Sequence, residues 1–492
     1  MSVLSKKLIG LFGTLGLVLL TTMAPRAHGA SVRDFGATGD GQTDDTEAIR
    51  RAVRDTPDGT VEFPRGEYRI TETIRIDLEQ TGRISLQGGG VGRVVMTGPG
   101  PAFHFIGTHR RSASPATFEP GVFEGQRMPQ VDGLEITGTH PEADGIEFSY
   151  VMQPTVRGTL IHRVRHGIRF TPNDPARERI ITSNRNVIIA DSHIYDCLGA
   201  GVYFDMVDLH QANITGNHIS YCKRGGIRLE RTSIRNLQIV GNDIEYNYDA
   251  EATDSADVLV DIREGGSVRE GTIVGNDIQA VRTPGGANIR MLGAPDSPDK
   301  IGLFAITGNH VSSQEVNIHL RNVRGVTVSG NSIRGGTHAL LIEDSRNIVV
   351  GNYSMDANPD YNAPGTEWAN GVSVRRSEGI LFNGVQVDQG LLGNPEEGGA
   401  IDVIACRNIT ITACQILAPR FRGIYVRDSS NVQIANCLVT AGEGSDSLIA
   451  GVEIAGSSKA VVVRGNLIAA GGKGTVVGNP ASVLASENQA PE

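Results

Sequence analysis

The sequence predicts an all-β protein: a single-stranded, right-handed parallel β-helix of about twelve stacked coils, with a short N-terminal capping helix. Two phrases that recur along the chain and a glycine-rich composition lead to this prediction. Sixty-two glycines, against one tryptophan, separate short runs of valine and isoleucine, which is typical of strands joined by tight turns. A helical solenoid is excluded, because the apolar residues do not recur at the 3.6-residue spacing of an α-helix.

Residues 1–29 have the features of a cleaved export signal. Lys6 and Lys7 precede an apolar stretch from Leu8 to Met23, and the small residues Ala27 and Gly29 suit a cleavage point. Because this stretch is short and interrupted by glycines, we expect cleavage and not anchoring in a membrane. The mature chain is therefore expected to be secreted, into the periplasm or outside a bacterial cell, without membrane insertion.

The predicted mature chain is acidic. Losing the signal removes three basic residues and no acidic one, which changes the formal net charge from −10 to −13. No run of basic residues offsets this charge. Nucleic acid is therefore excluded as an expected partner.

The first phrase reads hydrophobic, any residue, Gly, Asn, any residue, hydrophobic. Its asparagines are expected to take a left-handed turn conformation and to form hydrogen bonds from coil to coil. The asparagines are Asn217, Asn242, Asn276, Asn309, Asn331, Asn352 and Asn466.

The second phrase is a short strand in which apolar residues alternate with exposed ones. It occurs in twelve copies between Gly145 and Gly451, spaced 22 to 34 residues apart. Period-two alternation indicates strands, and a coil that cannot bury its apolar side alone must stack on its neighbours. We therefore expect a cap and first coils over residues 30–100, the β-helix over residues 101–475, and a C-terminal tail over residues 476–492.

Two pairs of cysteines occupy matching places on neighbouring coils. Cys197 pairs with Cys222 in this way, and Cys414 with Cys437. Each pair is either a disulfide, as an exported protein permits, or two stacked buried thiols.

The segment from Ser31 to Val53, together with Thr60 to Tyr68, closely resembles the opening of β-helix proteins of the pectate-lyase superfamily. That group includes polygalacturonase-like hydrolases, polysaccharide lyases, epimerases and phage tailspikes. Asp44 and Asp45 are expected to cap a helix that covers the end of the solenoid. The catalytic signatures of polygalacturonases, such as Gly-His-Gly and Arg-x-Lys, do not occur in the coil region.

Overlaying the twelve strand copies places three carboxylates in one outward row. Asp205, Glu230 and Asp261 fall on consecutive coils, about 5 Å apart. Because like charges repel, we expect a raised pKa for at least one of them, above all for Glu230 in the middle. Carboxyl groups with separated pKa values carry out glycoside cleavage, so these three are the candidate catalytic residues.

Groups that could bind sugar hydroxyls or a uronate carboxylate flank this row, and an indole ring in a nearby insertion could stack on a sugar. These candidate substrate-binding residues are Tyr203, Lys223, Arg228, Arg290, His319, Arg321 and Trp368.

Two other uses fit the row of carboxylates. In a uronate lyase the row could hold Ca²⁺, and Arg228, Arg290 or Lys223 would then be the base. In any other case no cofactor is expected. The row could also be a solvated face whose acids pair with Arg228, Arg263 and Arg290.

The predicted function is that of a secreted carbohydrate-active enzyme acting on a polysaccharide or oligosaccharide. Glycoside hydrolysis by paired carboxylates and uronate elimination are the two predicted reactions. The alternative is a glycan-binding or surface-structural β-helix without turnover. Both a monomer and a homotrimer agree with the sequence.

Overall fold

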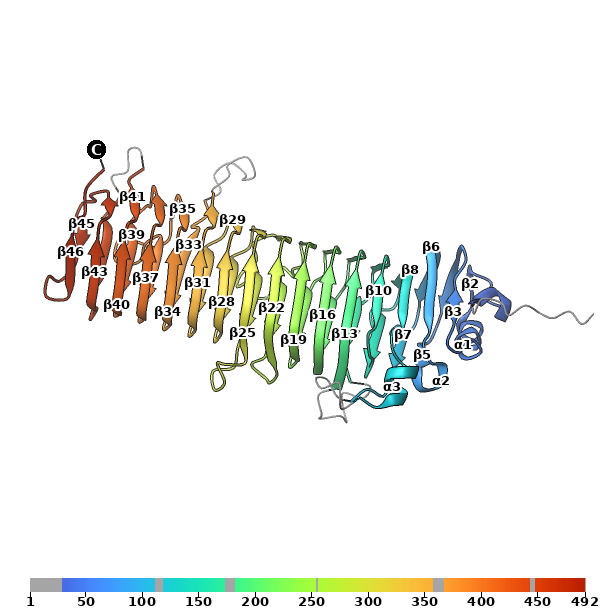
Figure 1. Cartoon of the computed structure of the whole chain (residues 1–492). Coiled ribbons are helices and arrows are strands. Elements are labelled where there is room, and N and C mark those ends of the chain that lie inside the picture. Colours follow the sequence, from blue (N-terminus) through green and yellow to red (C-terminus); the bar gives the residue numbers. More distant parts are fainter. Residues whose placement is uncertain are drawn as a thin grey trace, which may run out of the picture.

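The computed structural model describes residues 29–110, 118–172, 182–253, 255–356, 367–442 and 447–491. Its strands wind into an elongated rod, from the blue N-terminal end to the red C-terminal end (Figure 1). All strand ladders are parallel, and three strands form most coils. The predicted right-handed parallel β-helix is confirmed. The proposed export signal lies outside the described residues except for Gly29.

One face of the rod is a sheet of 15 strands. Its strands are β5 (Ile74–Asp77), β7 (Gly100–Ile106), β9 (Ala143–Ser149), β12 (Ile168–Phe170), β15 (Ala200–Asp205), β18 (Gly225–Glu230), β21 (Ala256–Asp261), β24 (Ala287–Leu292), β27 (Val316–Arg321), β30 (His338–Glu343), β33 (Gly371–Arg375), β36 (Ile401–Ile404), β39 (Arg422–Arg427), β42 (Ala450–Ala455) and β45 (Gly474–Val477). The twelve predicted copies are β9 to β42. In the described chain β5, β7 and β45 extend the sheet beyond the predicted twelve coils.

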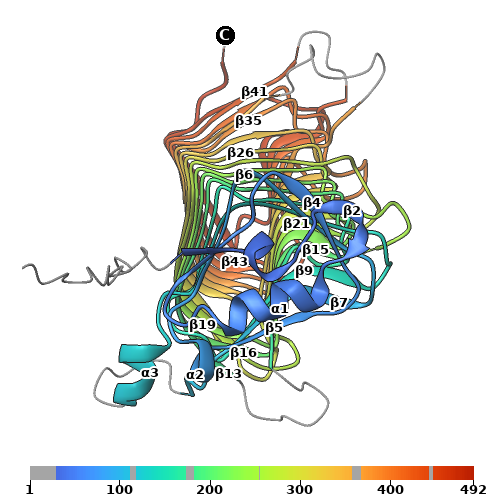
Figure 2. The ribbon, with the colours of Figure 1, turned by 90° about the vertical axis from the view of Figure 1, so that its right-hand side faces the viewer.

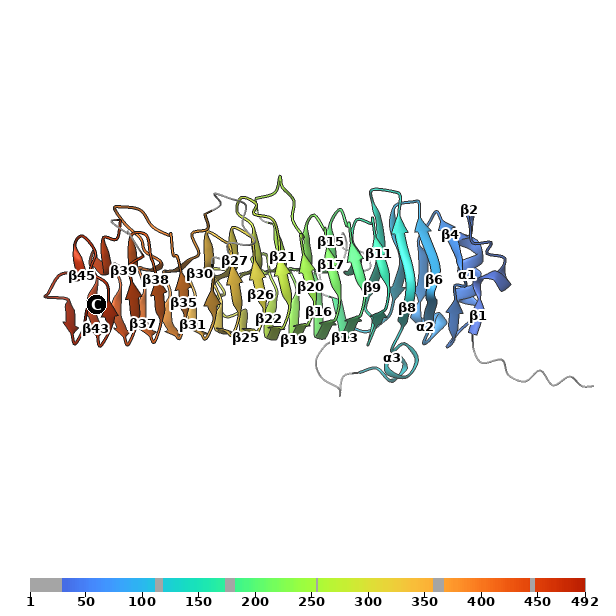
Figure 3. The ribbon, with the colours of Figure 1, turned by 90° about the horizontal axis from the view of Figure 1, so that it is seen from above.

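Strands that are mostly longer form a second face, which lies on the opposite side of the rod in Figure 3. This long-strand face contains β10 (Thr155–Arg157), β13 (Thr182–Ala190), β16 (Val207–Thr215), β19 (Ser233–Val240), β22 (Ser267–Val274), β25 (Ile301–Thr307), β28 (Arg324–Ser329), β31 (Arg346–Gly351), β34 (Glu378–Asn383), β37 (Arg407–Thr412), β40 (Ser430–Ala435), β43 (Lys459–Arg464) and β46 (Val483–Ser486).

Strands of two or three residues make up the remaining face. This short-strand face contains β11 (Leu160–His162), β14 (His193–Tyr195), β17 (His218–Ser220), β20 (Asp243–Glu245), β23 (Asp277–Gln279), β26 (His310–Ser312), β29 (Ser332–Arg334), β32 (Ser354–Met355), β35 (Gln386–Asp388), β38 (Gln415–Leu417), β41 (Leu438–Thr440) and β44 (Leu467–Ile468).

A cap closes the N-terminal end of the rod. It combines four helices with β1 (Gly29–Ser31), β2 (Asp40–Asp44), β3 (Thr60–Glu62), β4 (Gly66–Ile70), β6 (Ser85–Met96) and β8 (Gln130–Gly138). The helices are the 3-10 helix η1 (Val32–Phe35), α1 (Thr46–Arg54), α2 (Leu78–Thr81) and α3 (Pro120–Gly125). Helix α1 lies across the end of the coils, as predicted (Figure 2). No helix in the described ranges is long and apolar enough to cross a membrane.

The two aspartates that were predicted to cap the helix have different roles. Asp44 Oδ1 accepts hydrogen bonds from the backbone N–H and the hydroxyl of Thr46, the first residue of α1. Asp45 does not cap the helix with its side chain. Its carboxylate instead accepts the backbone N–H groups of Thr38 and Gly39, which fixes the preceding loop.

The asparagine column forms the predicted ladder of amides. Asn242 Nδ2 donates to Asn276 Oδ1 at 3.0 Å, and Asn276 Nδ2 donates to Asn309 Oδ1 at 2.9 Å. The left-handed backbone, however, falls on the glycine before each buried asparagine, such as Gly241. Asn352 departs from the column. It has the left-handed backbone conformation itself, and Tyr353 occupies the buried position instead.

In the predicted C-terminal tail, residues 476–492, the described part up to residue 491 instead adds to the solenoid. Strand β46 pairs in parallel with β43. Val476 and Val483 pack against the core and supply the apolar positions that a further coil needs.

The five cysteines are buried free thiols. Both predicted pairs therefore take the stacked-thiol form.

Candidate active site

The three predicted carboxylates stand in one row on the outer side of the fifteen-strand sheet. Asp205 pairs in register with Glu230, and Glu230 pairs with Asp261. Their side chains are 6%, 23% and 15% exposed respectively. Glu230 is therefore the most accessible acid of the row.

Every carboxylate of the row contacts a guanidinium group. The partners are Arg169 (2.9 Å) and Arg231 for Asp205, Arg228 (2.8 Å) for Glu230, and Arg263 (2.6 Å) for Asp261. Two of these pairs, with Arg228 and Arg263, are those expected of a solvated face. Because each acid already has a cationic partner, the row does not fit a Ca²⁺ site.

The expected rise in the pKa of Glu230 is wrong. Burial works to raise this pKa, but the hydrogen bond and charge of Arg228 and the hydroxyl of Tyr203 outweigh it, so the pKa is lowered. Tyr203 Oη donates to Glu230 Oε2 at 2.7 Å. Glu230 is therefore an ionised carboxylate held by two donors.

A different acid near the row, Glu147 on β9, has a raised pKa. Its side chain is 11% exposed, and burial raises its pKa to about 7 although Arg169 works in the opposite direction. Glu147 Oε1 lies 3.4 Å from His104 Nε2. Glu147 is thus able to gain or lose a proton near neutral pH.

His104 is neutral beside this carboxyl group. Burial lowers its pKa to about 3. Ser149 Oγ donates to the carbonyl of Thr171 and therefore accepts the hydrogen bond from His104 Nε2, at 3.0 Å. The imidazole is polar but uncharged, so it does not balance the negative charge of an ionised Glu147. Arg169 balances that charge.

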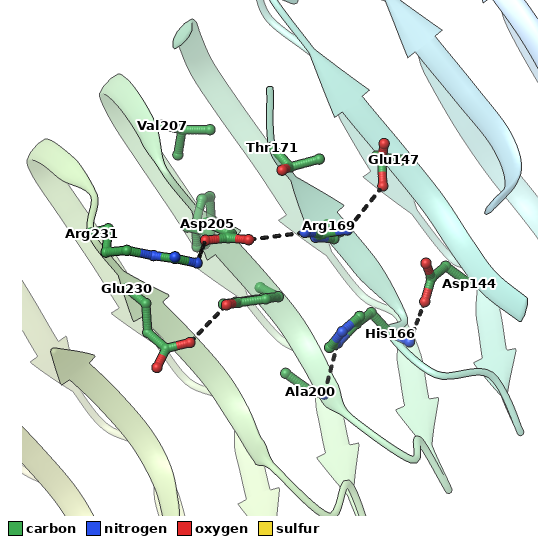
Figure 4. Close-up of polar contacts among 12 residues, drawn as sticks. Asp144, Glu147, His166, Arg169, Thr171, Ala200, Asp205, Val207, Glu230 and Arg231 are labelled. Atoms are coloured by element: carbon green, nitrogen blue, oxygen red, sulfur yellow. Dashed lines mark hydrogen bonds and ion pairs between the residues drawn. The ribbon is translucent and has the colours of Figure 1, made fainter. Parts of the chain in front are cut away.

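Arg169 lies between two carboxyl groups on different coils. Its Nη1 is 3.6 Å from Glu147 Oε2, and its Nη2 is 2.9 Å from Asp205 Oδ2. Figure 4 shows the continuous series Glu147, Arg169, Asp205 and Arg231, which runs from β9 through β12 and β15 to the residue after β18. The site thus holds one readily protonated acid and one carboxylate on opposite sides of a single guanidinium.

Tyr203 is fixed beside this series by His166. The two rings are 5.1 Å apart, and burial lowers the pKa of His166 to about 4. The Ala200 N–H donates to His166 Nδ1, so the ring proton is on Nε2 (Figure 4). This support holds the Tyr203 hydroxyl on Glu230.

The other predicted binding residues are not brought to this place. Arg290 and His319 lie farther along the sheet, where Arg290 Nε donates to His319 Nδ1 at 3.3 Å. Arg321 is exposed there and pairs with Asp344. Lys223 is exposed on the turn before β18. Trp368 lies against Gly335, the residue after β29, with Arg282 5.7 Å from its ring centroid.

The sequence places Glu147 among the outward residues of the repeated strand, but not in the column that contains the three carboxylates. It belongs to the first outward column and stands in register with Arg169. Asp205 belongs to the second column, one coil further on. The contact from Glu147 through Arg169 to Asp205 is therefore diagonal, since it joins residues of the two outward columns.

Two family models match this chain. Residues 29–114 match the family described as rhamnogalacturonase A/epimerase, pectate lyase-like. Residues 122–278 and 361–490 match the right-handed β-helix region. A segment of 44 residues is 52% identical to alginate lyase 7 of Azotobacter vinelandii, covering 8% of this chain and 5% of that protein.

Several solved structures are similar to this chain over most of its length. The mannuronan C-5 epimerase AlgE6 A-module of Azotobacter vinelandii is 14% identical, with a TM-score of 0.35, over 94% of this chain and 99% of that one. The Dettilon tailspike protein is 15% identical, with a TM-score of 0.46, over 81% and 68%. DFA-IIIase of Arthrobacter chlorophenolicus A6 is 13% identical, with a TM-score of 0.41, over 93% and 98%. The family-model match over residues 29–114 confirms the predicted resemblance to the pectate-lyase superfamily.

Proposed function

This chain belongs to the right-handed β-helix family, and from that premise we propose that it is a secreted enzyme that cleaves a polysaccharide or oligosaccharide by acid–base catalysis. One observation carries the proposal. A buried glutamic acid whose pKa is about 7, Glu147, is linked through Arg169 to the carboxylate of Asp205. Residues with such perturbed pKa values concentrate at functional sites.

Hydrolysis uses the two carboxyl groups in opposite roles. Glu147 donates its proton to the glycosidic oxygen as the bond to the sugar carbon breaks, and Asp205 accepts a proton from the water that attacks this carbon. The products are two sugars with a free hydroxyl at the broken bond. Because Arg169 separates the two carboxyl groups, we propose the inverting reaction, in which such groups stand about 6.5–9.5 Å apart.

Arg169 favours the transition state in this scheme. While Glu147 is protonated, the guanidinium has one full negative partner, Asp205. As the proton leaves, a second negative charge develops 3.6 Å from Nη1. An interaction that strengthens during the reaction lowers the barrier without tightening substrate binding to the same extent.

The neighbouring group of Tyr203, Arg228 and Glu230 is proposed to hold the sugar. Glu230 is the most accessible acid of the row, and a carboxylate accepts hydrogen bonds from sugar hydroxyls. Asp261, paired with Arg263, lies at the edge of this group. No step requires Ca²⁺, so the reaction is proposed to proceed in the presence of a chelator.

A second candidate function is glycan binding without turnover. The observation that favours it is the pairing of every acid in the row with an arginine, which is also what a purely structural or binding face would show. Both functions are proposed for a protein outside the cytoplasm, acting as a monomer or a homotrimer.

A panel of neutral and uronic-acid glycans tests the proposal. Each glycan is incubated with the full chain, with and without chelator, and assayed for new reducing ends and for the ultraviolet absorbance of unsaturated products. We expect new reducing ends without that absorbance. Absorbance would assign elimination instead, and binding without any product would favour the second candidate function.

Substitutions locate the activity. Glu147→Gln and Asp205→Asn are expected to reduce kcat by about 10²–10⁴-fold, the usual contribution of a general acid or base. Asp402→Asn is the matched control, because burial also raises the pKa of Asp402, to about 6, on the distant strand β36. Full activity in the Glu147 variant would contradict the proposed mechanism.

A further inference from the structure

The short-strand face carries a cluster of potential metal ligands away from the proposed active site. His218 on β17 stands in register with Asp243 on β20, and Glu245 lies two residues further along β20. His218 Nε2 is 3.5 Å from Glu245 Oε1 and 3.8 Å from Asp243 Oδ2. Within the described residues, these three ligand atoms all lie within 4.8 Å of one another.

We propose that His218, Asp243 and Glu245 bind a divalent transition-metal ion, with zinc as the ion whose ligand preference fits best. Zinc binds imidazole nitrogen and carboxylate oxygen at about 2.0–2.2 Å and is usually tetrahedral. At those bond lengths, two ligands of one ion lie roughly 3.4 Å apart. The distances from His218 Nε2 to both carboxylates are therefore close to those of a formed site.

The charges of the cluster favour a cation. Asp243 and Glu245 lie two residues apart on the same strand, next to the His218 ring. Two carboxylates that repel each other beside an imidazole nitrogen gain from a shared positive ion. The three side chains are also half-buried, with exposures of 35%, 49% and 19% in chain order, so an ion can reach them from solvent.

The surroundings hold Glu245 in place for this role. Gln279 Nε2, on the next coil, donates to Glu245 Oε2 at 2.6 Å, which leaves Oε1 as the oxygen on the His218 side. Such outer hydrogen bonds orient a ligating carboxylate. Ser220, the register partner of Glu245, is fully buried, and its hydroxyl has no hydrogen-bond partner among the described residues.

The ligand set selects the class of ion. Imidazole suits zinc and its neighbours in the first transition row, whereas Ca²⁺ and Mg²⁺ prefer oxygen ligands alone. Three protein ligands leave a fourth position for water. Because β17 and β20 belong to consecutive coils, the bound ion would join those coils and stabilise the solenoid.

Calorimetric titration of the full chain with zinc chloride tests this site. We expect one zinc ion per chain, no comparable binding of Ca²⁺, and a thermal unfolding midpoint that rises with zinc. His218→Ala and Glu245→Gln should each weaken zinc binding at least about tenfold, the usual minimum effect of losing metal-site contacts. The visible absorption of bound Co²⁺ should disappear in the same variants.

His310→Ala is the matched control. His310 Nδ1 lies 3.0 Å from Asp277 Oδ1 on the same face, but this pair offers two ligands and not three. The control should bind zinc as the wild type does. Absence of zinc binding in the wild type, or unchanged binding in the His218 and Glu245 variants, would overturn the proposal, whatever the glycan assays show.

Discussion

Glu147 and Arg169 face each other in register on neighbouring strands, with Arg169 Nη1 3.6 Å from Glu147 Oε2. The arginine lowers the pKa of this glutamic acid, and burial raises it further than the arginine lowers it. The contact with Arg169 therefore favours the ionised form of Glu147, whereas burial favours its neutral form.

The stability of the fold should depend on the protonation of Glu147. Its pKa is raised from 4.5 to about 7, so the folded chain binds this proton more tightly than the unfolded chain. The contribution to the free energy of unfolding is complete below the unfolded pKa and is lost as the pH rises through 7, by up to about 3 kcal/mol. Urea unfolding of the wild type and of Glu147→Gln at about pH 5 and pH 8 measures it.

The informative quantity is the difference between the two proteins at each pH. Buried Asp402 changes stability in the same direction, whereas buried histidines such as His104 change it in the opposite direction. These groups are common to both proteins and cancel. A difference that does not decrease between the two pH values would contradict the raised pKa of Glu147.

Arg169→Met should move the pH dependence of activity upwards. Removing the positive charge beside Glu147 raises the pKa of that acid further, so the alkaline decline in kcat/KM should shift to higher pH. The rate itself should fall, because Asp205 loses one of its two cationic partners. The measurement is a pH–rate profile on whichever glycan is cleaved, and an unshifted alkaline limb would separate Arg169 from the acid.

The amide ladder should be a major source of stability. Asn276→Ala removes four hydrogen bonds of one buried side chain, to Asn242, Asn309 and the carbonyl of Ile239. Leaving buried polar groups unpaired costs about 1–3 kcal/mol for each group, so we expect a loss of at least about 2 kcal/mol in the free energy of unfolding. Urea unfolding at neutral pH is the test.

Asn352→Gly is the control for this substitution. Asn352 is exposed and has a positive φ of 49°, which glycine adopts without strain. We expect a change within about 0.5 kcal/mol. Equal losses in the two variants would mean that burial in the ladder is not the source of the effect.

The cysteines should behave as buried thiols. A thiol reagent should label none of them rapidly in the native protein and all five after unfolding without reductant. A disulfide at Cys197 and Cys222, or at Cys414 and Cys437, would lower the number labelled in the unfolded state by two for each bridge.

The repeated phrases carry most of the fold. Their period-two alternation determines which residues point outwards, and stacking then determines their neighbours. For this reason the row of Asp205, Glu230 and Asp261 is correct in register. The departure of Asn352 from the asparagine column cannot be predicted in this way. Val349 and Val350 are both hydrophobic and could each occupy the buried position before the turn, and only packing places Val350 there.

The chemistry of the site is less accessible to sequence. The lowered pKa of Glu230 depends on Arg228, two residues earlier on the same strand and therefore on the same side of the sheet. The raised pKa of Glu147 depends on burial, which a column of outward residues does not reveal. Side-chain direction can be predicted from alternation, but the depth at which a side chain is covered cannot.

The regular rise of the coils also sets a length scale along the fifteen-strand sheet. Arg169 on β12 and His319 on β27 occupy the same outward column, five strand steps apart. At about 4.8 Å for each step, this fixes the two groups roughly 24 Å from each other. A linear glycan lying along the sheet would meet them at that interval. Gain or loss of one whole coil between Arg169 and His319 would change the distance between them by about 4.8 Å. The local contacts of Arg169 and of His319 would stay intact.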